Sequence, residues 1–147
     1  MYELLYCSLA SQDLTADDIS DILKTSQQWN SKHEITGCLL YYNNQFIQII
    51  EGNKSAVKNL YANIEKDIRH NNIIILAENE KNERAFENWS MAFNELSKSD
   101  MNNIDKVLSI DNFITFSVSD HKLTKATKMF CNMAKAPFIK LTNPDND

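Results

Sequence analysis

The pattern of hydrophobic and polar positions along the chain predicts alternating strands and helices. Strands are expected at residues 2–9, 73–80 and 88–95, a hairpin over residues 37–52 that turns around Asn43 and Asn44, and helices over residues 15–30 and 53–70. Thr15 and Asp18 resemble a capping box at the start of the first helix, with Asp in place of the usual Glu. In this order, β-α-β-β-α-β-β, the first six elements match a ferredoxin-like α+β fold.

Both strands of the central hairpin are apolar on both faces. Leu39 and Tyr41 point to one side, and Leu40 and Tyr42 point to the other. A strand of this kind is covered by two layers. We therefore expect the two main helices on one face of the sheet and C-terminal helices on the other. The segments that provide this second cover are predicted helices over residues 100–110 and 120–138.

The apolar stripe of the second helix is predicted to consist of Val57, Leu60, Tyr61, Ile64 and Ile68. These positions follow the three- and four-residue spacing of one helical face. No low-complexity run or internal repeat divides the chain of 147 residues. We therefore expect one compact unit, made of a domain over residues 1–96 and a helical extension over residues 97–147.

Composition narrows the classes of partner. The net charge is -5 and the pI is about 5.2, so no broad basic surface is expected for nucleic acid or for an anionic membrane. No apolar run is long enough for a membrane span, and the N-terminus lacks the features of a secretory signal. Cys7, Cys38 and Cys131 lack the spacing of a zinc site, which favours free thiols in a reducing, cytoplasmic setting.

Polar residues interrupt the strand and helix faces that are expected to point into the protein. Gln48 shares a strand face with Phe46 and Ile50, so its amide needs partners inside an otherwise apolar strand. On the first helix, Ser26 and Asn30 continue the apolar stripe and turn it polar near the C-terminal end. An alternative interpretation places Ser26 and Asn30 at a frayed helix end in water and Gln48 on an edge strand.

The second predicted helix carries a comparable polar row. Asn63, Asp67 and His70 follow i, i+4, i+7 spacing and flank its apolar stripe. A buried amide or carboxylate without a partner costs about 1–3 kcal/mol. Several such groups directed at one groove between the two helices predict a ligand that is polar and partly aromatic.

Five short motifs in sequence order resemble one known family. They are "LLYCS" at 4–8, Asn30 followed by "ITG" at 35–37, "FIQIIEG" at 46–52, "DIRH" at 67–70 and "FENWSM" at 86–91. The chain resembles the BLUF family, small bacterial blue-light sensors that bind a flavin. The resemblance covers about residues 2–96 and fades to a general expectation of two C-terminal helices beyond them.

The resemblance implies non-covalent FAD, or FMN or riboflavin in its place, with the flavin ring inserted between the two helices. It implies that Asn30 bonds near the flavin C4 carbonyl and that Gln48 lies between the flavin and Tyr6. The implied flavin-binding positions are Tyr6, Ser26, Asn30, Gln48, Asn63, Asp67, Arg69, His70 and Met91, and the implied photochemical positions are Tyr6, Gln48, Trp89 and Met91. Ideal helical geometry directs Arg69 away from the groove, unless the second helix ends near Ile68.

In the implied mechanism, light drives electron transfer from Tyr6 to the flavin, and Gln48 rearranges its hydrogen bonds. The absorbance shifts slightly to the red, and the change passes through the fifth strand and the C-terminal helices. We expect the output to be a light-dependent protein partner or a change in self-association. Enzymatic activity is not expected, because residues 97–147 are too few for a cyclase or a phosphodiesterase.

Two positions depart from patterns common in the family. Trp29 stands where relatives often carry small polar residues or histidine, and Asn63 stands where some carry arginine. The first change can alter stacking on the flavin edge, add a competing electron donor, or only shield the surface. The second can loosen the binding of flavin.

Two other functions remain as alternatives. An acylphosphatase-like enzyme needs an anion-binding loop with glycine and arginine, whereas this chain has only Gly37 and Gly52, and residues 9–14 contain no arginine. A flavin-free interaction module of the same fold is the second alternative. Such a module has no need of the set formed by Tyr6, Asn30, Gln48 and Met91, so their presence argues against it.

Overall fold

A computed structural model describes the backbone of residues 1–87, 92–96 and 124–142, and the side chains of residues 1–87 and 124–133. One sheet has the strand order β4-β1-β3-β2-β5. Its strands are β1 (Tyr2–Ala10), β2 (Thr36–Tyr42), β3 (Gln45–Gly52), β4 (His70–Glu80) and β5 (Ala92–Leu96). The first four pair antiparallel, and β5 pairs parallel with β2 at the edge. The predicted ferredoxin-like α+β fold is confirmed.

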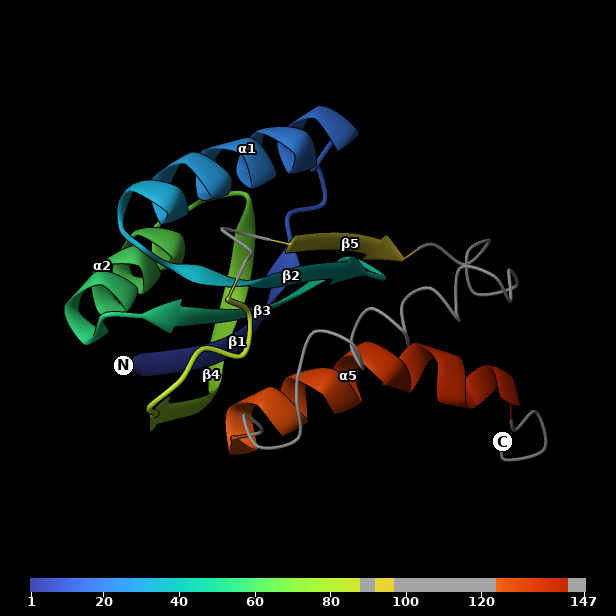
Figure 1. The fold of residues 1–147 in the computed structure, drawn as a ribbon. Coiled ribbons are helices and arrows are strands. Elements are labelled where there is room, and N and C mark those ends of the chain that lie inside the picture. The colour runs from blue at the N-terminus through green and yellow to red at the C-terminus, as the bar shows by residue number, and fades with distance from the viewer. Residues whose placement is uncertain (88–91, 97–123, 143–147) are drawn as a thin grey trace.

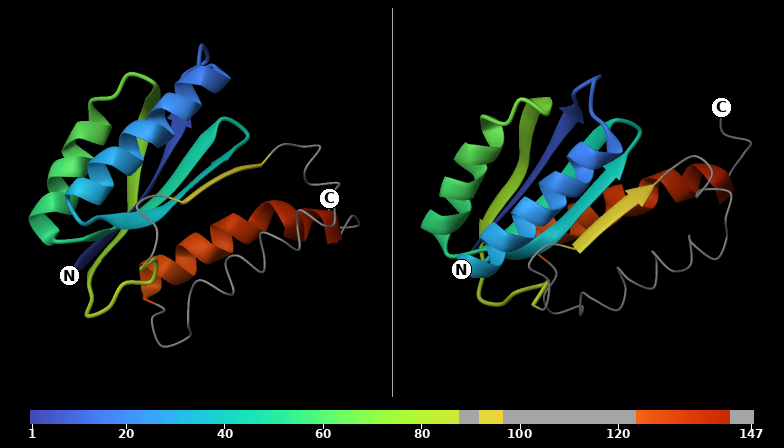
Figure 2. Two further views of the ribbon diagram at one scale, coloured as in Figure 1. Left: turned by 45° about the horizontal axis from the view of Figure 1, so that its top comes forward. Right: turned by 90° about the horizontal axis from the view of Figure 1, so that it is seen from above.

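Helices cover both faces of the sheet. Figures 1 and 2 show α1 (Ala16–Lys32) and α2 (Lys54–Glu65) on one face and α5 (Lys125–Thr142) on the other. The predicted helix over 120–138 corresponds to α5. The predicted helix over 100–110 and the first half of the predicted strand over 88–95 lie outside the described residues. The division at residue 96 stays a prediction.

The double cover expected for the central hairpin is confirmed. Toward α1 and α2, Leu39 and Phe46 belong to a buried cluster with Val57. Toward α5, Leu40 and Ile49 belong to a second cluster. Alternate residues of β2 and β3 therefore enter two separate cores, as strand geometry requires.

Local sequence explains how the hairpin forms. Asn43 and Asn44 both have positive φ, of 50° and 61°, which a two-residue hairpin turn of the primed kind requires and asparagine tolerates. At Gly37 a Cβ atom would lie 2.1 Å from the carbonyl oxygen of Ile49, so the paired strand leaves room only for glycine. The capping box of Thr15 and Asp18 is present at the start of α1.

The second helix is shorter than predicted. It ends at Glu65, and the last residues of the predicted helix form a turn and the first residue of β4. The carboxylate of Asp67 accepts a hydrogen bond from the backbone N–H of Arg69 at 3.0 Å, which offers the chain a local alternative to another helical turn. The prediction that Ile68 lies on the buried stripe is wrong, because the turn leaves it 92% exposed.

Candidate functional site

A cavity of about 290 Å³ lies over the sheet between α1 and α2. This volume is near the lower limit, about 300 Å³, of typical small-molecule pockets. The lining side chains come from both helices, from β1, β2 and β3, from the turn before β4 and from the first residue of β4. They are Tyr6, Ile22, Thr25, Ser26, Trp29, Leu39, Phe46, Gln48, Leu60, Asn63, Ile64, Asp67, Arg69 and His70.

The floor of the cavity is a pair of residues from adjacent strands. Tyr6 of β1 and Gln48 of β3 are direct cross-strand partners. The Tyr6 hydroxyl donates a hydrogen bond to Oε1 of Gln48, and both side chains are buried. Burial raises the pKa of Tyr6 far above its usual range, so the phenol keeps its proton at neutral pH. The pair is therefore a neutral donor and a neutral acceptor.

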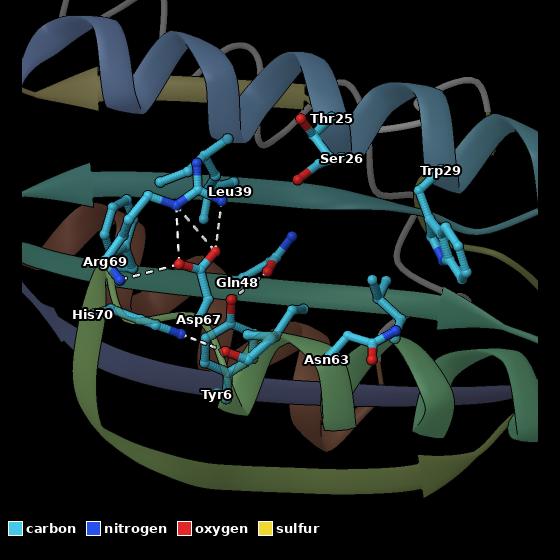
Figure 3. A pocket seen from close by; sticks show the side chains of 14 residues that line it. Tyr6, Thr25, Ser26, Trp29, Leu39, Gln48, Asn63, Asp67, Arg69 and His70 are labelled. Carbon is cyan, nitrogen blue, oxygen red and sulfur yellow. Dashed lines mark hydrogen bonds and ion pairs between the residues drawn. The ribbon is translucent and has the colours of Figure 1, made fainter.

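Gln48 can act at two ends. Its Oε1 faces the phenol, whereas its Nε2 carries two donor hydrogens. Figure 3 shows the amide between Tyr6 and the side of α1 that carries Ser26. A ligand in the cavity would thus meet a side chain that exchanges donor for acceptor when its amide turns over.

His70 closes one end of the cavity and is held by both ring nitrogens. Nε2 lies 2.6 Å from the carbonyl oxygen of Ile64, and Nδ1 lies 2.8 Å from the hydroxyl oxygen of Ser8. Because a carbonyl only accepts, Nε2 carries the proton, and in the neutral ring Nδ1 accepts from the Ser8 hydroxyl. His70 therefore serves as a fixed wall.

An ion pair lies at the same end of the cavity. The Nε and Nη2 atoms of Arg69 donate to the carboxylate of Asp67, with the shortest distance 2.6 Å, and Nη1 reaches Asp21 of α1 at 3.4 Å. These bonds from Arg69 lower the pKa of Asp67. The contact with Asp21 joins the turn before β4 to α1 across the cavity.

Trp29 stands at the opposite end of the cavity from Arg69 (Figure 3). It is 38% exposed, and its indole stacks on the ring of His33 with centroids 3.9 Å apart and an interplanar angle of 20°. Asn63 of α2 lines the cavity on the same side. An aromatic face and an amide therefore border the mouth of the cavity.

Seven of the residues predicted for the site line the cavity: Tyr6, Ser26, Gln48, Asn63, Asp67, Arg69 and His70. Asn30 is fully buried on α1 but is not among the lining residues. Trp89 and Met91 lie outside the described residues. Asp67 and Arg69 reach the cavity from a turn, and His70 reaches it from β4, so the helical spacing predicted for this row is wrong.

Sequence analysis missed the apolar walls and one hydroxyl of the cavity: Ile22, Thr25, Leu39, Phe46, Leu60 and Ile64. A signal for two of them was available. Phe46 shares a strand face with Gln48, and Leu39 lies opposite Gln48 in the β2–β3 ladder. Their contribution to a cavity wall follows once the face that carries Gln48 is known to be the helix side.

The lining suits a flat aromatic ring with a polar edge. Leu39, Phe46 and Leu60 provide apolar surface, while Gln48, Asn63 and Arg69 carry donors. This is the chemistry that an isoalloxazine ring requires, since it is aromatic on its faces and carries carbonyl and nitrogen groups at its edge. The residues present therefore fit a flavin.

A family model described as "BLUF: Sensors of blue-light using FAD" matches residues 1–92, well over half of the chain. The chain belongs to the BLUF family. By its description, FAD is the cofactor of this family, and the matched region is a blue-light sensor module.

Relatives of the BLUF chain include much longer proteins. The photoactivated adenylate cyclase subunit beta of Euglena longa is 39% identical over 83 residues, which are 56% of this chain and 10% of that protein. The chain thus spans a tenth of the length of this relative. What the rest of such a protein does is no property of the matched region.

Solved structures of similar size support the assignment to BLUF. "BlsA photo-activated state" has a TM-score of 0.67 and 26% identity, and covers 90% of this chain and 93% of its own. "BlrB - a BLUF protein, dark state structure" has a TM-score of 0.66 and 26% identity, and the match covers 92% of this chain and 96% of that one.

Within the described part of the chain, no helix is both long and apolar enough to cross a membrane.

Proposed function

We propose that this chain is a blue-light photoreceptor in which Tyr6 and Gln48 form the photochemical pair. The observation that carries the proposal is the buried hydrogen bond from the Tyr6 phenol to Gln48 on the floor of the cavity between α1 and α2. Membership of a family of blue-light sensors that use FAD supports it.

Bound flavin supplies the absorption of blue light and an electron acceptor. Tyr6 gives up an electron, and its phenolic proton moves along the existing hydrogen bond toward Gln48. Return of the electron and proton restores the phenol and leaves Gln48 with a changed hydrogen-bond pattern. Since burial keeps Tyr6 protonated, the proton is in place before light arrives.

The remaining lining residues hold the flavin. Leu39, Phe46 and Leu60 would supply apolar contacts to a bound flavin, and Asn63 and Arg69 would supply hydrogen-bond donors to it. Asn30, Trp89 and Met91 complete the proposed site. His70 keeps the end of the cavity closed, because its ring is fixed at both nitrogens.

The proposed output is regulation of a protein partner, or self-association, in response to light, without catalysis by this chain. A photoactivated adenylate cyclase among the relatives supports a downstream effector. A new hydrogen bond contributes about 0.5–1.5 kcal/mol net, which can shift a balanced two-state contact but cannot refold a domain. A released or recruited partner fits that magnitude.

The light-minus-dark absorption spectrum of the purified protein tests the function. We expect a yellow protein whose flavin band shifts slightly to the red in light and returns in darkness. A colourless protein that takes up no added FAD, FMN or riboflavin would contradict the proposal and favour a flavin-free interaction module.

A further inference from the structure

Three charged side chains are withdrawn from water on the α5 side of the sheet, opposite the cavity. Glu3 and Glu51 are fully buried, and the Lys81 side chain is 3% exposed. The Lys81 ammonium lies 2.7 Å from Oε2 of Glu3 and 2.7 Å from Oε2 of Glu51. We call Glu3, Glu51 and Lys81 the charge cluster.

The carboxylate of Glu51 holds the segment that follows β4. Its oxygens accept the backbone N–H groups of Ala85 at 3.0 Å and Phe86 at 2.7 Å, and the hydroxyl of Thr36 at 2.9 Å. Arg84 donates to the same hydroxyl and to the backbone carbonyl of Glu51. This set compensates a charge whose burial would otherwise be strongly unfavourable.

The carboxylate of Glu3 reaches α5. Its Oε2 accepts from the hydroxyl of Thr127 at 3.3 Å, and its Oε1 accepts from Asn79 at 3.3 Å. Thr127 is fully buried in the first turn of α5, where its backbone N–H donates to the hydroxyl oxygen of Thr124 at 3.1 Å. The cluster thus has polar links to β1, β3, the segment after β4 and α5.

The same two strands carry the photochemical pair and the two carboxylates of the charge cluster. Tyr6 lies opposite Gln48 in the β1–β3 ladder, and Glu3 lies opposite Glu51 three residues along the same ladder. Three residues of strand span about 10 Å, and odd spacing places the two pairs on opposite faces. A displacement of β3 against β1 at Gln48 therefore changes the geometry at Glu51.

We propose that the charge cluster passes the change at Tyr6 and Gln48 through the sheet to α5, with Thr127 as its contact on the helix. This proposal rests on the proposed light-sensing function and names its route of output. Bonds to a buried carboxylate depend steeply on distance and direction. By contrast, the contact of Phe130 with Phe86 is apolar and tolerates small shifts.

Hydrogen exchange of the α5 amides, in darkness and in light, tests the route. The samples are the wild type, Thr127→Val and Thr127→Ser, each as the full chain loaded with FAD. The shift of the flavin absorption band in light is recorded for each sample. In the wild type, we expect light to speed exchange in α5 by about two- to tenfold, the range that the loss of one hydrogen bond supports.

Thr127→Val keeps the shape of the side chain and removes the hydroxyl. It should retain the red shift and lose the light-dependent change in exchange, whereas Thr127→Ser should retain both. Glu3→Leu is a second variant: it removes the acceptor of the Thr127 hydroxyl, leaves Lys81 paired with Glu51, and should also uncouple α5. Circular dichroism in the dark checks that each variant is folded.

The proposal is overturned if Thr127→Val responds like the wild type, or if wild-type α5 shows no light-dependent exchange while its flavin band shifts. Both results leave the photochemistry intact and thus separate failure of the route from failure of the function. A wild-type protein without any red shift overturns both together.

Discussion

Tyr6 and Gln48 face each other across β1 and β3, and the phenol of one donates to the amide oxygen of the other. Tyr6→Phe removes the hydroxyl that donates this hydrogen bond, and with it the phenol that is the proposed source of the electron and the proton. The variant should bind flavin, remain yellow and lose the red shift in light-minus-dark spectra. Tyr61→Phe is the matched control, since Tyr61 is also buried and its ring centroid lies 5.7 Å from that of Tyr6. An intact photocycle in Tyr6→Phe would refute the mechanism.

Gln48→Leu should also abolish the red shift, and it should lower stability. The substitution leaves the Tyr6 hydroxyl buried without its acceptor, which costs about 1–3 kcal/mol. Urea denaturation in the dark measures this cost. Gln45→Leu makes the same change at an exposed position of the same strand, so it should leave both the spectrum and the stability near those of the wild type.

Stability should fall at alkaline pH because of buried phenols. Burial raises the pKa of Tyr61 to about 12 and that of Tyr6 higher still, while phenols of the unfolded chain ionise near pH 10. Above about pH 10 the folded state therefore binds more protons than the unfolded state, so unfolding becomes easier as pH rises.

Urea denaturation from about pH 9 to pH 12 measures this decline. The stabilisation is fully present below about pH 10 and is lost as pH rises through the folded-state pKa values. Tyr6→Phe removes one of the raised groups, so its stability should decline less steeply than that of the wild type. Equal slopes would contradict the burial of an ionisable phenol at this position.

Asp67→Asn should lower the free energy of unfolding at neutral pH, and this difference from the wild type should disappear in acid. Arg69 lowers the pKa of Asp67, so the pair stabilises the fold above about pH 4 and ceases to do so as pH falls through the depressed pKa. The side chains are 30% and 29% exposed, which limits the effect to about 1 kcal/mol.

Thermal unfolding of wild type and Asp67→Asn across the acid range checks this prediction. Asparagine can still accept the backbone N–H of Arg69, so the turn before β4 should persist. Asp21→Asn is the control, because its contact with Arg69 is longer, 3.4 Å, and Asp21 is 71% exposed. A difference between wild type and Asp67→Asn that grows in acid would reverse the expected sign.

Phe130→Ala should loosen α5 without closing the flavin cavity. Phe130 is 1% exposed in the core cluster between α5 and the sheet, and truncation of a buried Phe costs about 3–5 kcal/mol. Chemical denaturation should register this loss, while flavin binding persists in the folded fraction, since the cavity lies on the other face. Lys128→Ala, at an exposed position of the same helix, is the control.

The sequence sufficed for the fold where patterns were local. The strands of the hairpin are apolar on both faces, so cover on both sides of the sheet could be predicted. The turn at Asn43 and Asn44 could be predicted from residue type. The end of α2 could not be predicted in the same way. The hydrogen bond that the backbone N–H of Arg69 donates to the Asp67 carboxylate competes with another helical turn, and helical periodicity contains no information about that competition.

The buried polar residues of the two sheet faces show the same division. Gln48 was found because an amide in an apolar strand needs an explanation. Glu51 is as deeply buried but could not be predicted from the sequence. A carboxylate near a strand end gives no sign of burial, and its partners, Lys81 and the backbone N–H of Phe86, are known only from the structure. Partners that lie some 30 residues apart are set by the tertiary fold.

The stack of Trp29 on His33 at the mouth of the cavity gives the protein a built-in optical reporter. The chain contains two tryptophans, and Trp29 is the one that borders the cavity among the described side chains. Replacing Trp89 by Phe would leave a single indole, whose emission a flavin bound in the cavity would quench. The loss of tryptophan emission under ultraviolet excitation would then follow the uptake of the ligand.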